Sequence, residues 1–258
     1  MDIQRIVLLK VPLDIVEPEE LPELINSMRL PGGIHGSTPA ASDNNARGRN
    51  IVLLSIWDLL RARRNDEYRN YILKADLVLP VSKSLVSGAR FLTGKKLVRY
   101  MPFKFVISLL SILEQHEYPL YLLGGTSRVL KKAERNIHST FPRLRIVGRR
   151  EGSMHKQDEP IIIEAIRKAS PSLLLAGKGI RGEELWIARH SDRLNSGFRL
   201  WCSDLFDVFA EKKHRPSDAI FERGLENIGI CFRNPLKFFR FFLYLWYKIL
   251  LVVNKLKH

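Results

Sequence analysis

Short apolar runs recur along the chain, each bounded by turn-forming or charged residues. Seven such runs are Ile6–Leu9, Ile51–Leu54, Leu77–Leu79, Leu120–Leu123, Leu144–Val147, Leu173–Leu175 and Phe198–Trp201. Longer stretches with the helical spacing of apolar positions lie between several of them, namely Trp57–Leu73, Phe103–Glu117, Arg128–Ser139 and Pro160–Ala169. Apolar strands that alternate with helices are typical of a parallel sheet covered on both faces. The pattern therefore predicts an α/β fold, in which a mostly parallel sheet lies between two layers of helices.

Other parts of the sequence limit the kind of protein further. The segment Pro31–Asn50 is rich in Gly, Pro, Ser and Asn and is predicted to be a loop. Lys10 and Pro12 interrupt the first apolar run, which makes the start unlike a signal peptide. Cys202 and Cys231 are the two cysteines of the chain, too few for a disulfide framework or a four-cysteine zinc site. We expect a cytoplasmic protein.

The charge of the chain predicts an anionic partner. Lys and Arg number 42 against 27 Asp and Glu, which gives a formal net charge of +15. Nucleic acid, anionic lipid and a phosphorylated substrate all fit such an excess. No nucleic-acid partner is expected, because the chain has no recognisable nucleic-acid motif and its most concentrated basic segment is interleaved with apolar residues.

That basic segment is the last part of the chain, residues 233–258, which contains no acidic residue. On a helix, its polar positions fall within one stripe of roughly 80°. Those positions are Arg233, Lys237, Arg240, Tyr244, Lys248 and Lys255, with Leu251 as the apolar exception. A narrow basic stripe beside a wide aromatic face is typical of a helix that lies in the surface of an anionic membrane.

This interpretation divides the chain into a domain over residues 1–232 and a membrane-attachment tail over residues 233–258. The predicted membrane-binding residues are Arg233, Lys237, Arg240, Lys248 and Lys255. Two alternatives stay open: a helix packed in the core or in an oligomer, and a membrane-spanning helix. A span would place Arg240 and Lys248 inside the ~20 residues that it requires.

Two glycine turns follow predicted strands, where ligands bind in Rossmann-like parallel sheets. The first is Gly124-Gly125, which leads into a helix starting near Ser127, and the second contains Gly177 and Gly179. Glycine allows close approach of the backbone to a ligand, and a helix N-terminus attracts a diphosphate. The second turn matches neither a P-loop nor the dinucleotide motif. Plain architecture is the alternative for both turns.

The order of several segments resembles the WecG/TagA/CpsF family of glycosyltransferases over nearly the whole chain. These segments are RIVLLKVPLDIV at the start, Leu59–Pro80, YLLGGTSRVLKKAERNIHSTFPRLRIVG, ELWIARHSDRL, LFDVFAEKKHRP and RGLEN. The resemblance implies transfer of an N-acetylmannosamine-type sugar from a UDP donor to a polyprenyl-diphosphate-linked acceptor, in cell-surface polysaccharide synthesis. It also implies inversion at the anomeric carbon without a metal or other cofactor, by a peripheral protein on the inner face of the cell membrane. A homo-oligomer is a further expectation.

By the same resemblance, seven residues are expected to bind substrate: Gly124, Gly125, Gly177, Gly179, Glu184, Asp207 and Arg215. The expected general base is missing, because the family's Pro-Asp-Gly falls on Pro80-Val81-Ser82, and Glu183 stands where the family has glutamine. A valine cannot accept a proton, which removes a contribution of roughly 10²–10⁴-fold to the rate.

Two functions therefore remain open. The first is an active transferase in which Asp58, Ser82 or Asp204 replaces the base. The second is a catalytically inactive family member that binds a nucleotide-sugar, a lipid intermediate or a partner enzyme at the membrane.

Overall fold

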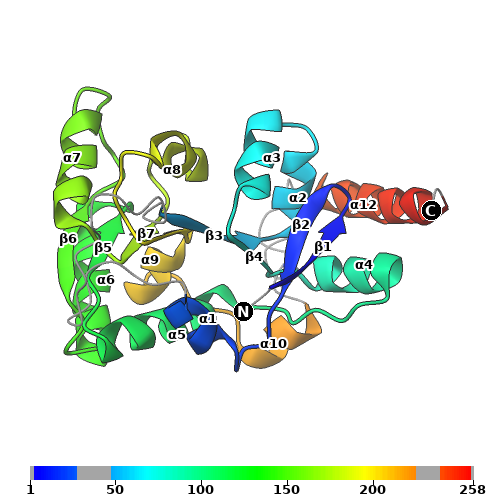
Figure 1. Cartoon of the computed structure of the whole chain (residues 1–258), viewed down its shortest axis with the longest axis horizontal. Helices are drawn as coiled ribbons and strands as arrows, with labels where there is room; N and C mark the ends of the chain where they lie inside the picture. Colours follow the sequence, from blue (N-terminus) through cyan, green and yellow to red (C-terminus); the bar gives the residue numbers. More distant parts are fainter. Residues whose placement is uncertain (1–2, 28–47, 225–238, 257–258) are drawn as a thin grey trace.

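The computed structural model describes residues 3–27, 48–224 and 239–256, and its centre is a six-stranded sheet (Figure 1). The strand order is β4-β3-β8-β7-β5-β6, and every neighbouring pair is parallel. All six strands therefore end at the same edge of the sheet, which we call the carboxyl edge. The predicted layered α/β fold with a mostly parallel sheet is confirmed.

The described elements follow one another in the chain as β1 (Gln4–Leu8), β2 (Val11–Ile15), α1 (Leu21–Ser27), β3 (Arg49–Leu54), α2 (Ile56–Ala62), α3 (Asp66–Leu73), β4 (Leu77–Pro80), α4 (Lys83–Thr93), α5 (Pro102–Gln115), β5 (Leu120–Leu123), α6 (Ser127–Thr140), β6 (Ile146–Arg150), α7 (Glu159–Ala169), β7 (Leu173–Ala176), α8 (Glu184–His190), β8 (Phe198–Trp201), α9 (Leu205–Phe209), α10 (Asp218–Arg223) and α12 (Phe239–Leu256). Six of the seven predicted apolar runs lie in or overlap strands of this sheet.

Three strands of the sheet are buried on both faces, as their continuous apolar sequences require. All four residues of β4, of β5 and of β7 are buried. One face of the sheet packs against α1, α5, α6 and α9 in a single apolar cluster. The other face carries two clusters, one with α2, α3, α4 and α12 and the other with α7 and α8.

A buried arginine lies on the central strand β8. Arg199 is 1 % exposed, and its guanidinium donates hydrogen bonds to Asn50 Oδ1 at 2.9 Å, to the Ser191 carbonyl at 2.5 Å and to the Gly48 carbonyl. A buried charge is tolerated only when its donors are satisfied in this way. Arg199 thereby ties the start of β3 to the residues that follow α8.

Contrary to expectation, the first apolar run, Ile6–Leu9, does not join the main sheet. It forms β1, which pairs antiparallel with β2 in a separate two-stranded sheet. Arg5 of β1 holds Asp14 of β2 through two hydrogen bonds of 2.6 and 2.9 Å, and Asp14 also accepts from the Val78 N–H of β4 at 2.7 Å. The buried Asp14 carboxylate thus fastens the hairpin to the edge of the main sheet.

Two other expectations need correction. The stretch Trp57–Leu73, predicted as one helical segment, is divided into α2 and α3, because the Asn65 side chain caps a new helix by accepting from the Tyr68 N–H at 2.8 Å. The predicted loop Pro31–Asn50 ends earlier, since Arg49 and Asn50 already belong to β3. Most of that loop lies outside the described residues.

The C-terminal segment forms the helix α12, which packs along α4 (Figure 1). Tyr247 and Leu251 are buried against this helix, and the Tyr247 hydroxyl donates to the Ser84 carbonyl at 2.9 Å. Leu251, expected within the outward stripe, is therefore a core residue. Arg233, Lys237 and the expected boundary at residue 232 lie outside the described residues. In the part of the chain that the structure describes, no helix is long and apolar enough to cross a membrane.

The contact between α12 and α4 depends on Gly88, and this gives a first prediction. A Cβ atom at Gly88 would collide with the Tyr247 hydroxyl. We expect Gly88→Ala to lower the free energy of unfolding by about 1–3 kcal/mol, the usual effect of overpacking. Removing the hydroxyl should relieve the collision, so Gly88→Ala/Tyr247→Phe should be more stable than Gly88→Ala alone. Urea denaturation of the wild type, Gly88→Ala and the double variant measures their free energies of unfolding. A double variant less stable than Gly88→Ala would contradict the proposed contact.

Candidate active site

Four turns meet at the carboxyl edge through backbone hydrogen bonds. They follow β5, β6, β7 and β8. The Gly125 N–H donates to the Lys178 carbonyl at 2.6 Å, the Gly152 N–H donates to the Gly125 carbonyl at 2.9 Å, and the Lys178 N–H donates to the Ser203 carbonyl at 3.0 Å. We call this meeting point the glycine junction, defined by Gly124, Gly125, Gly152, Gly177 and Gly179.

The predicted glycines are needed at the junction for steric reasons. Gly124 has φ +128°, and a Cβ atom there would lie 2.6–2.8 Å from the backbone of Gly177. A Cβ atom at Gly177 would in turn lie 2.7 Å from the Phe206 ring. The structure thus brings together the four glycines that the sequence singled out, including Gly125 and Gly179. Their role in substrate binding stays a prediction.

The helix α6 begins directly after this junction. Thr126 caps it by accepting from the Val129 N–H at 3.4 Å. The Ser127 N–H donates to Glu151 Oε2 at 3.1 Å, so a carboxylate already occupies part of the positive helix terminus.

A lysine inside the second turn joins the junction to the buried Asp207. Lys178 Nζ pairs with Asp207 Oδ2 and lies 3.5 Å from Asp204 Oδ1, while Lys213 Nζ lies 2.5 Å from Asp204 Oδ2. The hydrogen bond that Lys178 donates to Asp207 raises the pKa of Lys178. Asp207 is 3 % exposed, and its Oδ1 atom has no hydrogen-bond partner among the described residues. Sequence reasoning did not single out Lys178, although a charged residue in a glycine turn after a buried strand is an available signal.

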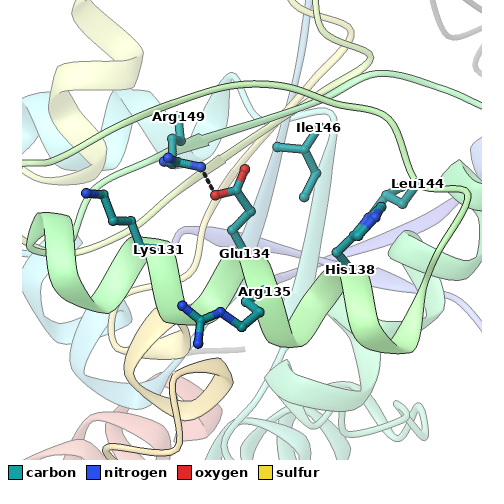
Figure 2. Close-up of a pocket in the computed structure, with 7 residues that line it drawn as sticks. All are labelled: Lys131, Glu134, Arg135, His138, Leu144, Ile146 and Arg149. Atoms are coloured by element: carbon teal, nitrogen blue, oxygen red, sulfur yellow. Dashed lines mark hydrogen bonds and ion pairs between the residues drawn. The ribbon is translucent and has the colours of Figure 1, made fainter.

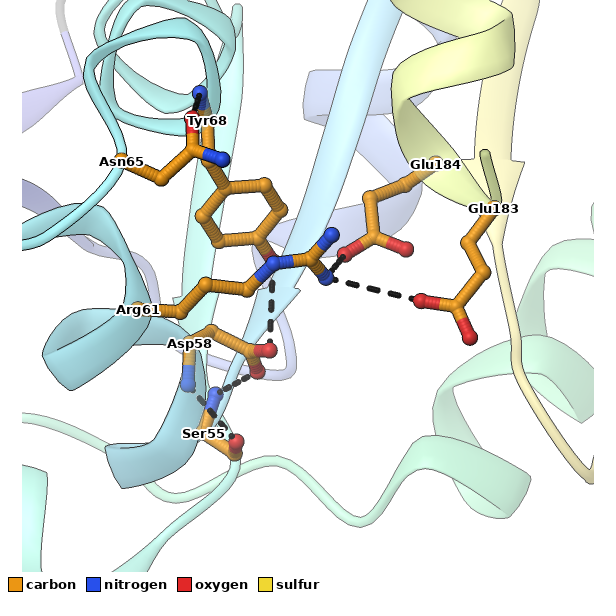
Figure 3. A network of polar contacts seen from close by, with 7 residues as sticks. All are labelled: Ser55, Asp58, Arg61, Asn65, Tyr68, Glu183 and Glu184. Atoms are coloured by element: carbon orange, nitrogen blue, oxygen red, sulfur yellow. Dashed lines mark hydrogen bonds and ion pairs between the residues drawn. The ribbon is translucent and has the colours of Figure 1, made fainter. Parts of the chain in front are cut away.

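A second polar network lies between α2, α3 and α8 (Figure 3). Arg61 Nη1 lies 2.7 Å from Glu184 Oε1 and 3.5 Å from Glu183 Oε2. The guanidinium also stacks on the Tyr68 ring, 4.2 Å from its centroid, and the Tyr68 hydroxyl donates to Asp58 Oδ1 at 3.1 Å. Burial raises the pKa of Glu184, against the opposing effects of Tyr68 and Arg61.

Glu184 belongs to this polar network, whereas the predicted glycines belong to the glycine junction. Its side chain is 7 % exposed and faces Arg61 (Figure 3). Arg215 is exposed and stacks on Phe103 of α5, 5.2 Å from the ring centroid. Both residues remain predicted substrate contacts by resemblance alone.

The three residues considered as a replacement for the missing base all make contacts that stabilise the fold. Asp58 belongs to a capping box with Ser55, and Ser82 Oγ accepts from the Ile56 N–H at 3.1 Å. Burial raises the pKa of Asp204, but Lys213 and Lys178 outweigh it and the net pKa shift is downward. Each of the three therefore has a structural partner that occupies it.

Other places where a ligand could bind differ in character. An open groove of about 570 Å³ lies between α6 and β6, lined by Lys131, Glu134, Arg135, His138, Leu144, Ile146 and Arg149 (Figure 2). Its Arg149 pairs with Glu134. Within the described part of the chain, no three His, Cys, Asp or Glu side chains gather closely enough to hold a metal ion.

Comparison with known proteins identifies the class of protein that this fold and junction belong to. Residues 35–258 match the model of the glycosyl transferase WecG/TagA/CpsF family, so the chain belongs to this family. A relative from Bacillus subtilis (strain 168) is 21 % identical over 179 residues, which are 69 % of this chain and 69 % of the relative. That relative is an N-acetylglucosaminyldiphosphoundecaprenol N-acetyl-β-D-mannosaminyltransferase. The family resemblance expected from the sequence is confirmed.

The steric requirement at Gly124 gives a second prediction. Gly124→Ala should destabilise the protein more than Gly94→Ala, although both glycines have positive φ, because a Cβ atom at Gly94 meets nothing within 4 Å. The Gly94 variant should lose about 1 kcal/mol of unfolding free energy. The Gly124 variant should lose on the order of 1–3 kcal/mol more, since it also pushes two turns apart. Urea denaturation compares them, and equal losses would show that the turns do not touch.

Proposed function

We propose that the protein transfers an N-acetylmannosamine-type sugar from a UDP donor to a polyprenyl-diphosphate-linked acceptor. The observation that carries this proposal is the family match over residues 35–258, with the family's glycine turns closely packed at the carboxyl edge. Ligands of parallel α/β sheets bind at this edge. The relative's acceptor, a sugar on diphosphoundecaprenol, supports the lipid-linked acceptor.

The glycine junction suits a nucleotide diphosphate. Its turns carry no side chains at Gly125 and Gly179, so that a phosphate can approach the backbone closely. Lys178 supplies a cation at the same place, and the unpartnered Oδ1 of Asp207 supplies an acceptor for a ligand hydroxyl or N–H. In this proposal the residues Gly124, Gly125, Gly177, Gly179, Glu184, Asp207 and Arg215 bind substrate.

Binding and turnover can be measured separately, which gives a third prediction. UDP at roughly 100 times its dissociation constant should stabilise the protein by about 2.7 kcal/mol, because only the folded junction binds it. Lys178→Ala should reduce this shift. A thermal-shift titration measures binding, and incubation of UDP-sugars with a short-chain polyprenyl-diphosphate sugar measures transfer. Transfer by the B. subtilis relative under the same conditions is the control; no transfer by this chain with any donor would contradict the proposal.

The alternative is a catalytically inactive member of the family that binds a nucleotide-sugar, a lipid intermediate or a partner enzyme. Val81 favours it, because the position that should hold the base carries an aliphatic side chain. A UDP-dependent thermal shift without any sugar transfer would support this alternative.

The helix α12 is proposed to attach the protein to the inner face of the cell membrane. Seven apolar side chains on its side away from α4 are between 43 and 82 % exposed: Phe242, Leu245, Trp246, Ile249, Val252, Val253 and Leu256. Lys248 and Lys255 are exposed at the flank of this face, where lipid phosphates would meet them. Exposed apolar surface beside basic residues is what an interfacial helix presents to an anionic membrane.

Substitutions on this face give a fourth prediction. Trp246→Ser/Ile249→Ser should weaken binding to anionic vesicles about tenfold or more, because half of each side chain would otherwise enter the lipid. Lys248→Gln should weaken it by about 1 kcal/mol at low salt and less at high salt. Liposome sedimentation measures both.

The matched control for the membrane prediction is Ile161→Ser. Ile161 is an apolar residue of α7 that is 69 % exposed, and its loss should leave vesicle binding unchanged. If the α12 variants also sediment like the wild type, the exposed face of α12 does not bind the membrane. Gel filtration then tests whether a second copy of the chain covers it.

A further inference from the structure

We propose that the groove between α6 and β6 binds a soluble molecule that carries a phosphate group. The groove has a volume of about 570 Å³, within the range of roughly 300–1,000 Å³ that is usual for small-molecule sites. It opens at an edge of the sheet, because β6 is an outermost strand. None of its lining residues belongs to the glycine junction, so the inference concerns a second site and does not depend on the proposed transferase function.

The lining of the groove carries an excess of positive charge. Lys131 and Arg135 of α6 and Arg149 of β6 lie beside one carboxylate, that of Glu134, which pairs with Arg149 (Figure 2). Within the described residues, no acidic side chain forms an ion pair with Lys131 or Arg135. The formal charge of the lining, with His138 neutral, is therefore +2. A phosphate monoester with a charge of about −2 neutralises it.

The helix α6 keeps positive charges at positions where they cost stability. Arg128, Lys131 and Arg135 follow one another at spacings of three and four residues, so they lie along one side of the helix. Like charges at these spacings repel each other. The first turn of α6 contains Arg128 and no acidic residue, although the helix dipole favours acidic residues there. A bound anion would relieve both effects, which favours a ligand at this place.

A β-bulge in β6 brings Arg149 to the face of the sheet on which α6 packs. The register of β6 against β5 shifts after Ile146, so β6 contains one extra residue. In a regular strand, side chains alternate between faces, which would place Ile146 and Arg149 on opposite faces. The extra residue places both in the lining of the groove. Bulges at the edges of sheets commonly redirect a side chain in this way.

The groove also has an apolar part, formed by Leu144 and Ile146. Leu144 is buried and Ile146 is half-buried, and both belong to the apolar cluster between α6 and the sheet. A phosphate group offers three acceptor oxygens to the cations, whereas a carboxylate offers two. The lining therefore fits a phosphate group attached to a compact apolar or ring-shaped body, with the body against the apolar side chains.

The position of the groove favours a soluble ligand over a lipid headgroup. The helix α12 packs on α4, which follows the edge strand β4, whereas β6 is the opposite edge strand. Strand spacings of about 4.8 Å separate these two edges by about 24 Å. The helices α6 and α12 also cover opposite faces of the sheet. A membrane at the exposed face of α12 would therefore not reach the groove.

Titration with phenyl phosphate, a phosphate monoester on an apolar ring, tests the proposal. Saturating UDP is present, so that a nucleotide site at the glycine junction is occupied. The thermal transition temperature of the wild type should rise as phenyl phosphate is added. In Lys131→Gln/Arg135→Gln the affinity for phenyl phosphate should fall about tenfold or more, because two charge-assisted contacts are lost. Without phenyl phosphate this variant should be at least as stable as the wild type, since repulsion along α6 is removed.

The matched control is Lys95→Gln/Lys96→Gln. It removes two exposed lysines outside the groove and changes the net charge by the same amount, so it should bind phenyl phosphate like the wild type. An equal loss of affinity in this control would overturn the site, because net charge alone would then explain the effect. No shift in the wild type, or equal shifts in the wild type and the groove variant, would overturn it as well.

Two further measurements separate the ligand classes. Phthalate carries its negative charge on two carboxylates of an aromatic ring, and binding as tight as that of phenyl phosphate would overturn the assignment to phosphate. Sedimentation with anionic vesicles should be the same for the groove variant Lys131→Gln/Arg135→Gln as for the Lys95→Gln/Lys96→Gln control. Weaker sedimentation of the groove variant would make the groove a lipid site and overturn the assignment to a soluble ligand.

Discussion

The close contact between two glycine turns is the constraint on which the carboxyl edge depends. Gly124 brings the turn after β5 against the backbone of Gly177, and a side chain at Gly124 would separate the two turns. A side chain at Gly177 would collide with the Phe206 ring. In the same turns the Gly125 carbonyl accepts from the Gly152 N–H, and the Lys178 N–H donates to the Ser203 carbonyl. Backbone contacts between four separate segments thus form the junction at this edge.

Around this junction, charged side chains are arranged in two separate groups. On one side, Lys178 and Lys213 share Asp204 and Asp207 and leave the group formally neutral. On the other side, Arg61 faces Glu183 and Glu184 and leaves an excess of negative charge. Two groups of different net charge therefore lie along one edge of the sheet.

The sequence predicted the main sheet well, because strands buried on both faces are continuous apolar runs, as in Leu120–Leu123 and Leu173–Leu175. It missed the β1–β2 hairpin, whose two-residue turn has Leu9 and Lys10 at positive φ. Such turns are usually recognised by Asn-Gly or Asp-Gly, and neither is present. The glycines of the site could be read from their positions after strands. The contact of Arg61 with Glu184 could not be predicted, because the two residues are 123 positions apart in the chain.

Helical periodicity alone could not predict which side of α12 packs against the rest of the protein. Tyr247 and Leu251 are buried, whereas Trp246 and Ile249 are exposed, although all four are apolar or aromatic. What distinguishes them is a feature of the partner helix, the space that Gly88 leaves on α4.

The contacts of Tyr247 with Ser84 and of Lys255 with Phe91 show that α12 runs in the same direction as α4. Since α4 begins directly after β4, the described start of α12 lies toward the carboxyl edge. In the proposed membrane attachment, lipid covering the exposed face of α12 would then lie beside this edge.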